Sequence, residues 1–515
     1  MHACLNVDEI VRLIAHELIA SGGRGTAVGL ACCCKSFEDP VLDVLWATQT
    51  KLLPLLGCFP GEVWNEGGCT VSTPANVLSS LHNNPIRQSF KRLPTATEWA
   101  RFRKYARRMR ELGNRGAPNA LSFEVFSTIQ GHTINEPFLP NLKSLSLWRI
   151  EGPFVPFIPL FFSPRTTSIF LPFKPDHPKA MVASVVTTLP TLCPDLQEIR
   201  LSLPRDPIIT AAVSGMVLVV NQNVLQVFHV DSPLTEEAKE VVYKLPNLRD
   251  LLVIIEGETS LPSVSLPNLT RLTMRCDNEA GWPGFFQEAT FGKLESVIFL
   301  PESQQIGDFL GAFEHVGLSS SVQNTLSEFC LYTSRSWNPN YSSLLPFTQL
   351  VRLVIGFSCN GGCSSRVDDG LVIDLSRAMP QLKDLKLGGD PCQEFTTGVT
   401  ARGLMALAHH CRNLSSLCVH FQVASLSAPP TSAGRNASAG PTASWTDCAL
   451  TELVVGEICV PEESVLIVVL TLLQIFPRIE TFEGDGEGWS EVEDAICHSR
   501  QIADRSSKHH LLTIP

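Results

Sequence analysis

The chain has 515 residues, of which 44% are hydrophobic and 18% charged, and its formal net charge is −11. This length exceeds one ordinary compact domain unless the fold is a barrel or a repeat array, and the acidic balance disfavours a general nucleic-acid binder. The 17 cysteines are scattered without regular spacing, which disfavours a secreted disulfide framework and is typical of small buried side chains in a reducing compartment.

The first 50 residues are predicted to form a three-helix unit. Apolar residues spaced three and four apart share one face of its first helix: Ile10, Leu13, Ile14 and Leu18. The stretch SGGRGT ends this helix, and two further helical segments are expected over 27–34 and 39–46. Because SGGRGTA lacks the Gly-Lys-Ser/Thr ending of a phosphate loop, we interpret it as an inter-helix loop.

Residues 51–118 are predicted to be a helical connector that caps the rest of the chain. The clearest helix lies within RLPTATEWARFRKYARRMRELG, where Thr95 and Glu98 form a capping box and Gly113 ends the helix. Its apolar stripe has five members: Trp99, Phe102, Ala106, Met109 and Leu112. Arginine and lysine fill the other positions, and we expect them to be solvated.

One short pattern recurs throughout 119–515: an apolar residue, two others, an apolar residue, one other and a third apolar residue. It appears in segments such as LPNLKSLSL, LPNLRDLLV, LPNLTRLTM, MPQLKDLKL and CRNLSSLCV. The spacing of the copies overlaps the ~20–29 residues of leucine-rich repeats. Each copy is predicted to form a short strand whose apolar side chains point inward, and stacking buries a face that no single copy can bury.

Two features predict that the array is irregular. The asparagine usual three positions after the last leucine is replaced in nearly every copy, for example by Ile150, Asp277, Ser358, Asp390 and Gln422. The stretch 424–445 is rich in serine, alanine, proline and glycine. We predict a disordered insert between two repeats there.

The segment LNVDEIVRLIAHEL…VGLACCCKSFEDPVLDVLW resembles an F-box. The family pattern is Leu-Pro-x-Glu, an apolar helix, a Leu-x-x-Cys-Lys/Arg-x-Phe segment and a closing Leu-Trp. The matching residues are Leu5, Glu9, Ile10, Ile14, Leu30, Cys33 or Cys34, Lys35, Phe37, Leu42, Leu45 and Trp46. Val7 stands where the family has proline. The resemblance covers residues 1–50, and the overall layout is similar to the expanded F-box families of mushroom-forming fungi.

The predicted fold class is therefore an α/β repeat: an N-terminal three-helix F-box followed by an irregular leucine-rich-repeat solenoid with a strand-lined face. Cys32, Cys33 and Cys34 are then packing residues, since adjacent helix positions about 100° apart cannot converge on one metal ion. The pair Cys359 and Cys363 lacks a second pair that would complete a metal knuckle. We expect no metal and no cofactor.

The resemblance implies a non-catalytic adaptor. The F-box would bind a Skp-family adaptor within an SCF-type cullin–RING ubiquitin ligase, and the repeats would hold an unknown protein substrate for ubiquitin transfer by proximity. We expect the adaptor to contact apolar residues of the first 50: Leu5, Val7, Ile10, Ile14, Leu30, Phe37, Leu42, Leu45 and Trp46.

The substrate is expected on the strand face, where residues between the leucines point outward. The candidates are Trp148, Arg200, Arg271, Arg275, Tyr332, Arg352 and Lys386. Four of these candidates are cations of the later repeats: Arg271, Arg275, Arg352 and Lys386. They could form a basic strip that binds an acidic or phosphorylated segment. In the alternative interpretation the arginines serve solubility and pair with acids such as Glu328 and Asp384.

Two other classes of function stay open. The chain could be a leucine-rich interaction scaffold with a vestigial F-box and no role in ubiquitin transfer, for which Val7 is the hint. An enzyme is not expected, because no nucleophile–base–acid set is visible.

Two apolar segments bear on the expected location of the protein. Asp8, Glu9 and His16 interrupt the apolar residues at the N-terminus, so a signal peptide is not expected. The apolar run Ser464–Phe476 is shorter than the ~20 residues of a membrane span and is predicted to be a buried helix. We therefore expect a cytoplasmic or nuclear protein without membrane contact.

Overall fold

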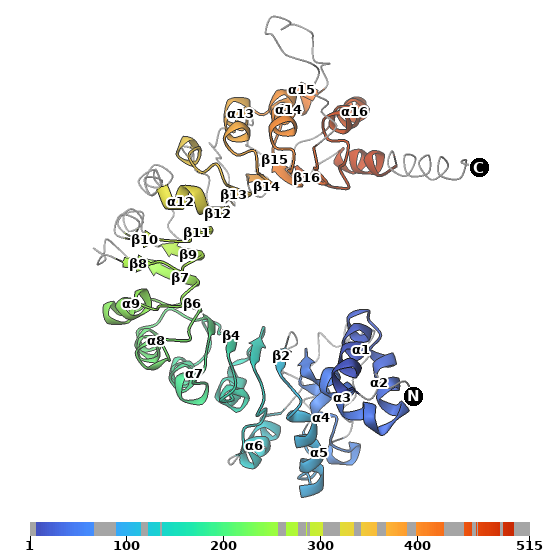
Figure 1. The fold of residues 1–515 in the computed structure, drawn as a ribbon, viewed down its shortest axis with the longest axis vertical. Helices are drawn as coiled ribbons and strands as arrows, with labels where there is room; N and C mark the ends of the chain where they lie inside the picture. Colours follow the sequence, from blue (N-terminus) through green and yellow to red (C-terminus); the bar gives the residue numbers. More distant parts are fainter. Residues whose placement is uncertain are drawn as a thin grey trace, which may run out of the picture. The chain divides into compact units, whose positions relative to one another are not determined.

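The computed structural model describes residues 7–65, 89–114, 122–133, 136–255, 264–276, 285, 289–301, 320–333, 341–357, 367–388, 398–426, 448–455, 460, 462–484 and 488–498. Leu5, the pair Cys359 and Cys363, and most of the predicted insert lie outside these residues. The chain divides into two compact units, Met1–Leu248 and Arg249–Pro515, each a mixed arrangement of helices and parallel strands (Figure 1).

The three predicted N-terminal helices are present as α1 (Asp8–Ala20), α2 (Arg24–Cys33) and α3 (Lys35–Ala47). Their core consists of Val11, Ala15, Ala27, Phe37, Val41 and Leu45. Gly22 makes the turn after α1 with a φ of +80°, which glycine adopts without strain. Cys34 is extended between α2 and α3 and packs partly against the core, whereas Cys32 and Cys33 are exposed. The expectation that all three cysteines pack is therefore wrong for two of them.

The predicted connector is not purely helical. It contains α4 (Leu53–Leu56), η2 (Gly61–Val63), α5 (Ala96–Ala106) and the strand β2 (Glu111–Asn114). The capping box of Thr95 and Glu98 is confirmed. The helix ends at Ala106 instead of Gly113, because the following residues pair as a parallel strand with β1 (Thr48–Gln49) on one side and with the next repeat on the other. The parallel ladder thus begins at Thr48, well before residue 119.

The ladder of the first unit continues through β3 (Ser144–Leu147), β4 (Ser168–Pro172), β5 (Glu198–Ser202) and β6 (Val227–Asp231). Leu145, Ile169, Ile199 and Phe228 are in register and buried, as the repeat pattern predicts. The helical segments between these strands pack along one side of the ladder (Figure 1). They are α6 (Phe123–His132), η5 (Gly152–Phe161), α7 (Lys179–Leu192), α8 (Pro207–Val219) and α9 (Glu236–Tyr243).

The second unit has nine strands in parallel order among its described residues: β7 (Asp250–Ile255), β9 (Arg271–Cys276), β11 (Ser296–Pro301), β12 (Glu328–Thr333), β13 (Arg352–Phe357), β14 (Asp384–Leu387), β15 (Ser416–Val419), β16 (Glu452–Val455) and β17 (Thr481–Gly484). A buried row runs across them from Leu272 through Leu353 and Leu385 to Phe482. Two short strands, β8 (Val264–Leu266) and β10 (Ala289–Phe291), pair separately.

The helical segments of the second unit are α12 (Ser320–Thr325), η6 (Tyr341–Leu344), α13 (Asp369–Ala378), α14 (Ala401–His410), α15 (Val423–Leu426), η8 (Glu462–Ser464) and α16 (Val465–Ile475). The prediction that the last apolar run is buried is only half correct. Val468, Val469 and Leu472 pack inward, while Leu466, Ile467 and Leu470 are exposed. Within the described residues, no helix combines the length and the apolarity that crossing a membrane requires.

Serine and threonine hydroxyls bridge repeats that lack the usual asparagine. Thr270 Oγ1 donates to the Arg249 carbonyl at 3.0 Å, and Ser415 Oγ donates to the Lys383 carbonyl at 2.9 Å. In the next repeat, Thr451 Oγ1 donates to the Ser415 carbonyl at 3.2 Å. Each of these carbonyls also accepts two backbone N–H groups from the next repeat, so the hydroxyls add to the backbone pairing between repeats.

Candidate functional site

The outer surface of the three-helix unit exposes several large apolar side chains. Leu13 is 66% exposed, Val28 is 50% exposed, and Val7 and Ile14 are also exposed. On α1 the inward face is taken by Val11 and Ala15, which leaves Leu13 and Ile14 on the outside. Large apolar side chains exposed on a small unit are candidates for contact with a protein partner.

The predicted adaptor residues divide between this surface and the interior. Val7 and Ile14 are exposed and Ile10 is half-buried. Leu30, Leu42 and Trp46 pack partly against the core. The expectation that Phe37 and Leu45 are available to a partner is wrong, because both are only 6% exposed and belong to the core itself. The predicted adaptor residues omit Leu13 and Val28, the two most exposed large apolar side chains among the described residues of this unit.

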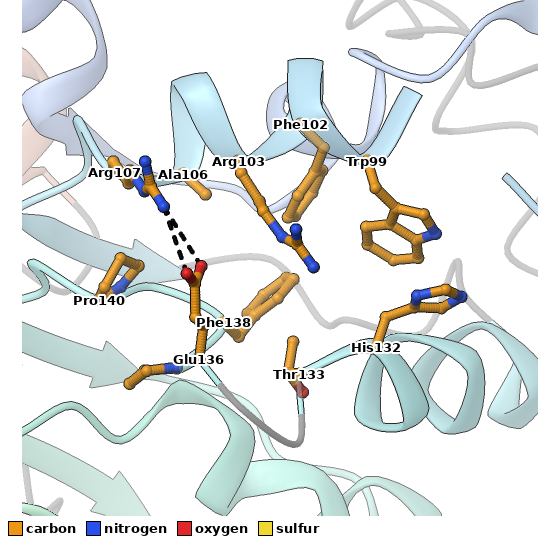
Figure 2. A pocket seen from close by; sticks show the side chains of 11 residues that line it. Trp99, Phe102, Arg103, Ala106, Arg107, His132, Thr133, Glu136, Phe138 and Pro140 are labelled. Carbon is orange, nitrogen blue, oxygen red and sulfur yellow. Dashed lines mark hydrogen bonds and ion pairs between the residues drawn. The ribbon is translucent and has the colours of Figure 1, made fainter. Parts of the chain in front are cut away.

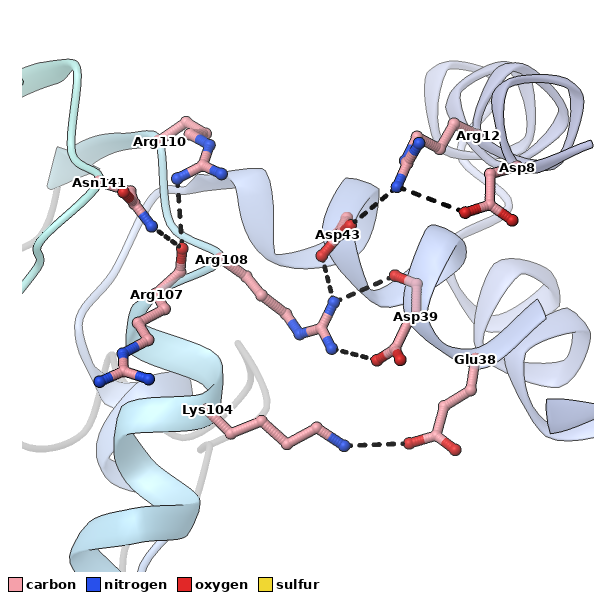
Figure 3. Close-up of polar contacts among 10 residues, drawn as sticks. All are labelled: Asp8, Arg12, Glu38, Asp39, Asp43, Lys104, Arg107, Arg108, Arg110 and Asn141. Carbon is pink, nitrogen blue, oxygen red and sulfur yellow. Dashed lines mark hydrogen bonds and ion pairs between the residues drawn. The ribbon is translucent and has the colours of Figure 1, made fainter. Parts of the chain in front are cut away.

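Basic residues on α5 and just after its end pair with the acidic side of α3 (Figure 3). The Arg108 guanidinium pairs with the carboxylates of Asp39 and Asp43, and its side chain is only 12% exposed. Lys104 Nζ lies 3.2 Å from a carboxylate oxygen of Glu38. The expectation that these basic residues are solvated is therefore wrong for Arg108, whereas Lys104 pairs with Glu38 and stays exposed.

Backbone and aromatic contacts extend the same junction. The Arg110 N–H donates to the Ala47 carbonyl at 2.8 Å, and the rings of Trp46 and Tyr105 lie 4.8 Å apart between centroids. Trp46 thus packs against α5, and the end of α3 is joined directly to the first strands of the ladder.

An aromatic pair of the exposed Trp148 and the half-buried Phe170 lies on the strand side of the first unit. Trp148 is 54% exposed, and its ring centroid lies 4.9 Å from that of Phe170. Phe170, Arg200 and His229 are in register across neighbouring strands. The Arg200 guanidinium lies 3.4 Å from the Glu198 carboxylate, so this candidate cation has an acidic neighbour.

Two of the four cations in the predicted basic strip of the second unit pair with acids. Arg352 lies 3.1 Å from Glu328 and 3.0 Å from Asp384, as the alternative interpretation expected. Arg271 pairs with the buried Asp250 at 3.1 Å. Each exposed guanidinium therefore faces a carboxylate, and these two arginines do not present free positive charge to a ligand.

The remaining candidates on this face differ in exposure. Tyr332 is exposed, whereas Arg275 and Lys386 are half-buried. Thr273, expected outside with its arginine neighbours, is buried between the aliphatic Leu252 and Ile298 that flank it in register.

A small pocket lies between α5 and the segment that follows α6 (Figure 2). Its lining residues are Trp99, Phe102, Arg103, Ala106, Arg107, His132, Thr133, Glu136, Pro137, Phe138 and Pro140. The rings of Trp99 and His132 stack at 4.5 Å, and Arg107 pairs with Glu136 across the rim at 3.3 Å. The pocket therefore combines aromatic rings with a charged pair at its rim.

Two cysteine thiols on the strand face have raised pKa values. Burial, with a contribution from the carboxylate of Glu328, raises the pKa of the Cys330 thiol to about 12. Burial likewise raises the pKa of Cys418. In the part of the chain that the structure describes, no group of three histidine, cysteine or acidic side chains is arranged to hold a metal ion.

No family model matches this chain, and no curated protein matches it. Among solved structures, a chain of the structure described as "Crystal structure of Rad7 and Elc1 complex in yeast" is similar to it, with 18% sequence identity and a TM-score of 0.35. That alignment covers 55% of this chain and 71% of the other. A function for this chain therefore has to be argued from its own geometry.

Proposed function

We propose that this chain is the substrate-recognition subunit of an SCF-type cullin–RING ubiquitin ligase. The three-helix unit would act as the F-box and bind a Skp-family adaptor, and the strand face would bind a protein substrate. The chain itself would perform no chemistry, and ubiquitin transfer would follow from holding the substrate close to the ligase.

One observation supports this proposal above the others. The three-helix unit buries its own core and still leaves Leu13, Ile14 and Val28 exposed. A surface of this kind on a separate helical unit favours a permanent protein partner, because leaving large apolar groups in water is unfavourable.

The junction with α5 supports the same function. Ion pairs of Arg108 and the packing of Trp46 on Tyr105 hold the three-helix unit against the start of the ladder. A receptor that works by proximity gains from such a junction, because a fixed distance between adaptor and substrate raises the effective concentration of the reacting groups.

The proposal is tested by capture of a Skp-family adaptor on the purified full-length chain. Leu13→Asp combined with Val28→Asp should reduce adaptor binding at least tenfold, because desolvated apolar anchors are each worth about 2 kcal/mol. Leu466→Asp, an exposed apolar position on α16, is the matched control and should bind normally.

Undiminished adaptor binding by the double variant would contradict the proposed surface. If the wild-type chain captures no adaptor yet retains a partner through its repeats, the interaction scaffold with a vestigial F-box is the correct class. Leu45→Ala is unsuitable as a test, because Leu45 lies in the core of the unit and its loss would destabilise the fold.

A further inference from the structure

The segment that contains α5 is strongly basic within an acidic chain. Residues 89–114 contain eight Lys and Arg residues and only two acidic residues, in a chain of net charge −11. The exposed positions in the second half of α5 and at its C-cap lie three and four residues apart, so they form one continuous face. They are Ala100, Arg101, Arg103, Lys104 and Arg107.

Carboxylates from other parts of the first unit already bind to this face. Arg107 lies 3.3 Å from a carboxylate oxygen of Glu136, on one side of the face. Lys104 lies 3.2 Å from Glu38, on the side next to α3. The basic side chains of α5 thus bind carboxylates where the fold supplies them.

Arg101 and Arg103 lie on the same face and have no such partner. Both are exposed, and neither pairs with an acidic side chain among the residues that the structure describes. The neighbouring sequence offers few acids, since Glu98 and Glu111 are the only Asp or Glu residues between positions 67 and 123. The Arg103 side chain points into the pocket below α5, where the carboxylate of Glu136 pairs with Arg107 (Figure 2).

We propose that the exposed basic face of α5, with the pocket at Arg103, binds an acidic segment of a partner protein. Arg101 and Arg103 would pair with carboxylates of that segment, because a guanidinium can hold a carboxylate through two parallel hydrogen bonds. Charge complementarity selects this partner, since a local positive surface attracts a negative segment. The inference uses none of the apolar residues of α1 and α2, so it does not rest on the proposed function.

A nucleic acid fits this surface less well than a short acidic peptide. The basic face belongs to one helix of 11 residues, about 16 Å long. Glu38 and Glu136 border the face and would repel a phosphate backbone. Residues outside 89–114 carry a net charge of −17, the chain total of −11 less the +6 of this segment. A long polyanion that continued past α5 would therefore meet like charge.

The test is fluorescence anisotropy of a labelled octaglutamate peptide titrated with the full-length chain. The wild type should bind the peptide, and the affinity should fall as salt is added, because exposed charges are screened. Arg101→Glu combined with Arg103→Glu should weaken binding at least tenfold, because the new carboxylates repel those of the peptide. Both positions are exposed, so circular dichroism and the melting temperature should stay unchanged.

Lys383→Glu combined with Arg412→Glu in the second unit is the matched control. It changes the net charge of the chain by the same amount at two exposed basic residues, and it should bind the peptide like the wild type. A wild type that does not bind, an equal loss in the control, or full binding by the Arg101 and Arg103 double variant would each overturn the proposal. Tighter binding of an oligothymidylate of equal charge would also overturn it, because the surface would then be a nucleic-acid contact.

Discussion

Arg108, two residues after the end of α5, donates a hydrogen bond to the carboxylate of Asp43 on α3, and the same carboxylate accepts a bond from Arg12 on α1 at 3.3 Å. Asp43 therefore joins α1 and α3 to the segment that follows α5. Arg108 also donates to the Asp39 carbonyl at 3.1 Å. One guanidinium thus holds the three-helix unit against the helix that leads into the repeats (Figure 3).

Arg108→Ala should loosen this junction. We expect a loss of about 1 kcal/mol in the free energy of unfolding, at the low end for charged hydrogen bonds because both carboxylates are substantially exposed. Amide hydrogen exchange in α3 should become faster. Arg108→Lys should give an intermediate effect, since lysine keeps the charge and cannot bridge two carboxylates with a planar fork. Unchanged exchange in α3 in the alanine variant would show that the junction is held by other contacts.

Gly403→Ala should destabilise the second unit. A β-carbon at this position would lie 2.6 Å from Oδ1 of Asp369, the oxygen that accepts from the Gly403 N–H at 3.0 Å. We expect a decrease of about 1–3 kcal/mol in the free energy of unfolding, measured by urea denaturation. The control is Gly131→Ala in α6, where nothing lies within 4 Å and stability should rise by about 0.4–1 kcal/mol. Equal effects of the two substitutions would contradict this account.

The capping box of α5 should weaken in acid. The pKa of Glu98 is lowered to about 2, first by the hydrogen bond from Arg92 and then by the backbone N–H of Thr95. A depressed pKa in the folded state means that the contribution is complete above about pH 4.5 and is lost as pH falls towards 2. Glu98→Gln should reduce the pH dependence of stability in this window. Identical acid titrations of the melting temperature in both proteins would exclude a role for Glu98.

Thiol labelling at neutral pH should separate the cysteines by environment. Burial raises the pKa of Cys411 to about 12 and protects its thiol. The pKa of Cys34 is lowered, mainly by its hydrogen bond with the Ser36 hydroxyl at 2.7 Å. A lower pKa gives more thiolate, so Cys34 should react with iodoacetamide much sooner than Cys411, and Ser36→Ala should slow it. Mass-spectrometric mapping checks the order, and prior labelling of Cys411 would contradict it.

Trp148→Ala should release a bound substrate, given the proposed function. Trp148 is the most exposed large aromatic residue on the strand face among the described residues, and truncation of such an anchor typically costs about 2 kcal/mol or more. We expect at least a tenfold loss in substrate capture with adaptor binding unchanged. Tyr332→Ala, on the strand face of the second unit, tests whether the loss of substrate capture is specific to the first unit. Full substrate capture by the Trp148 variant would place the binding surface elsewhere.

The sequence by itself determined which residues of the repeats point inward. In copies such as LPNLTRLTM and MPQLKDLKL, Leu272 and Leu385 are buried where the alternation of a strand places them. The capping box of Thr95 and Glu98 was equally predictable. Both features depend on residues a few positions apart, so the local backbone geometry decides them.

The tertiary structure alone decided where α5 ends and what the charged residues do. The stretch after Ala106 continues a helical apolar pattern, yet Leu112 enters a strand because β1 and β3 offer backbone pairing on both sides. Leu45 matches a family position and is buried, because α1 and α2 cover it. Arg352 is neutralised by two acids that come from neighbouring strands. Each outcome depends on partners distant in sequence, and periodicity within one segment contains no information about them.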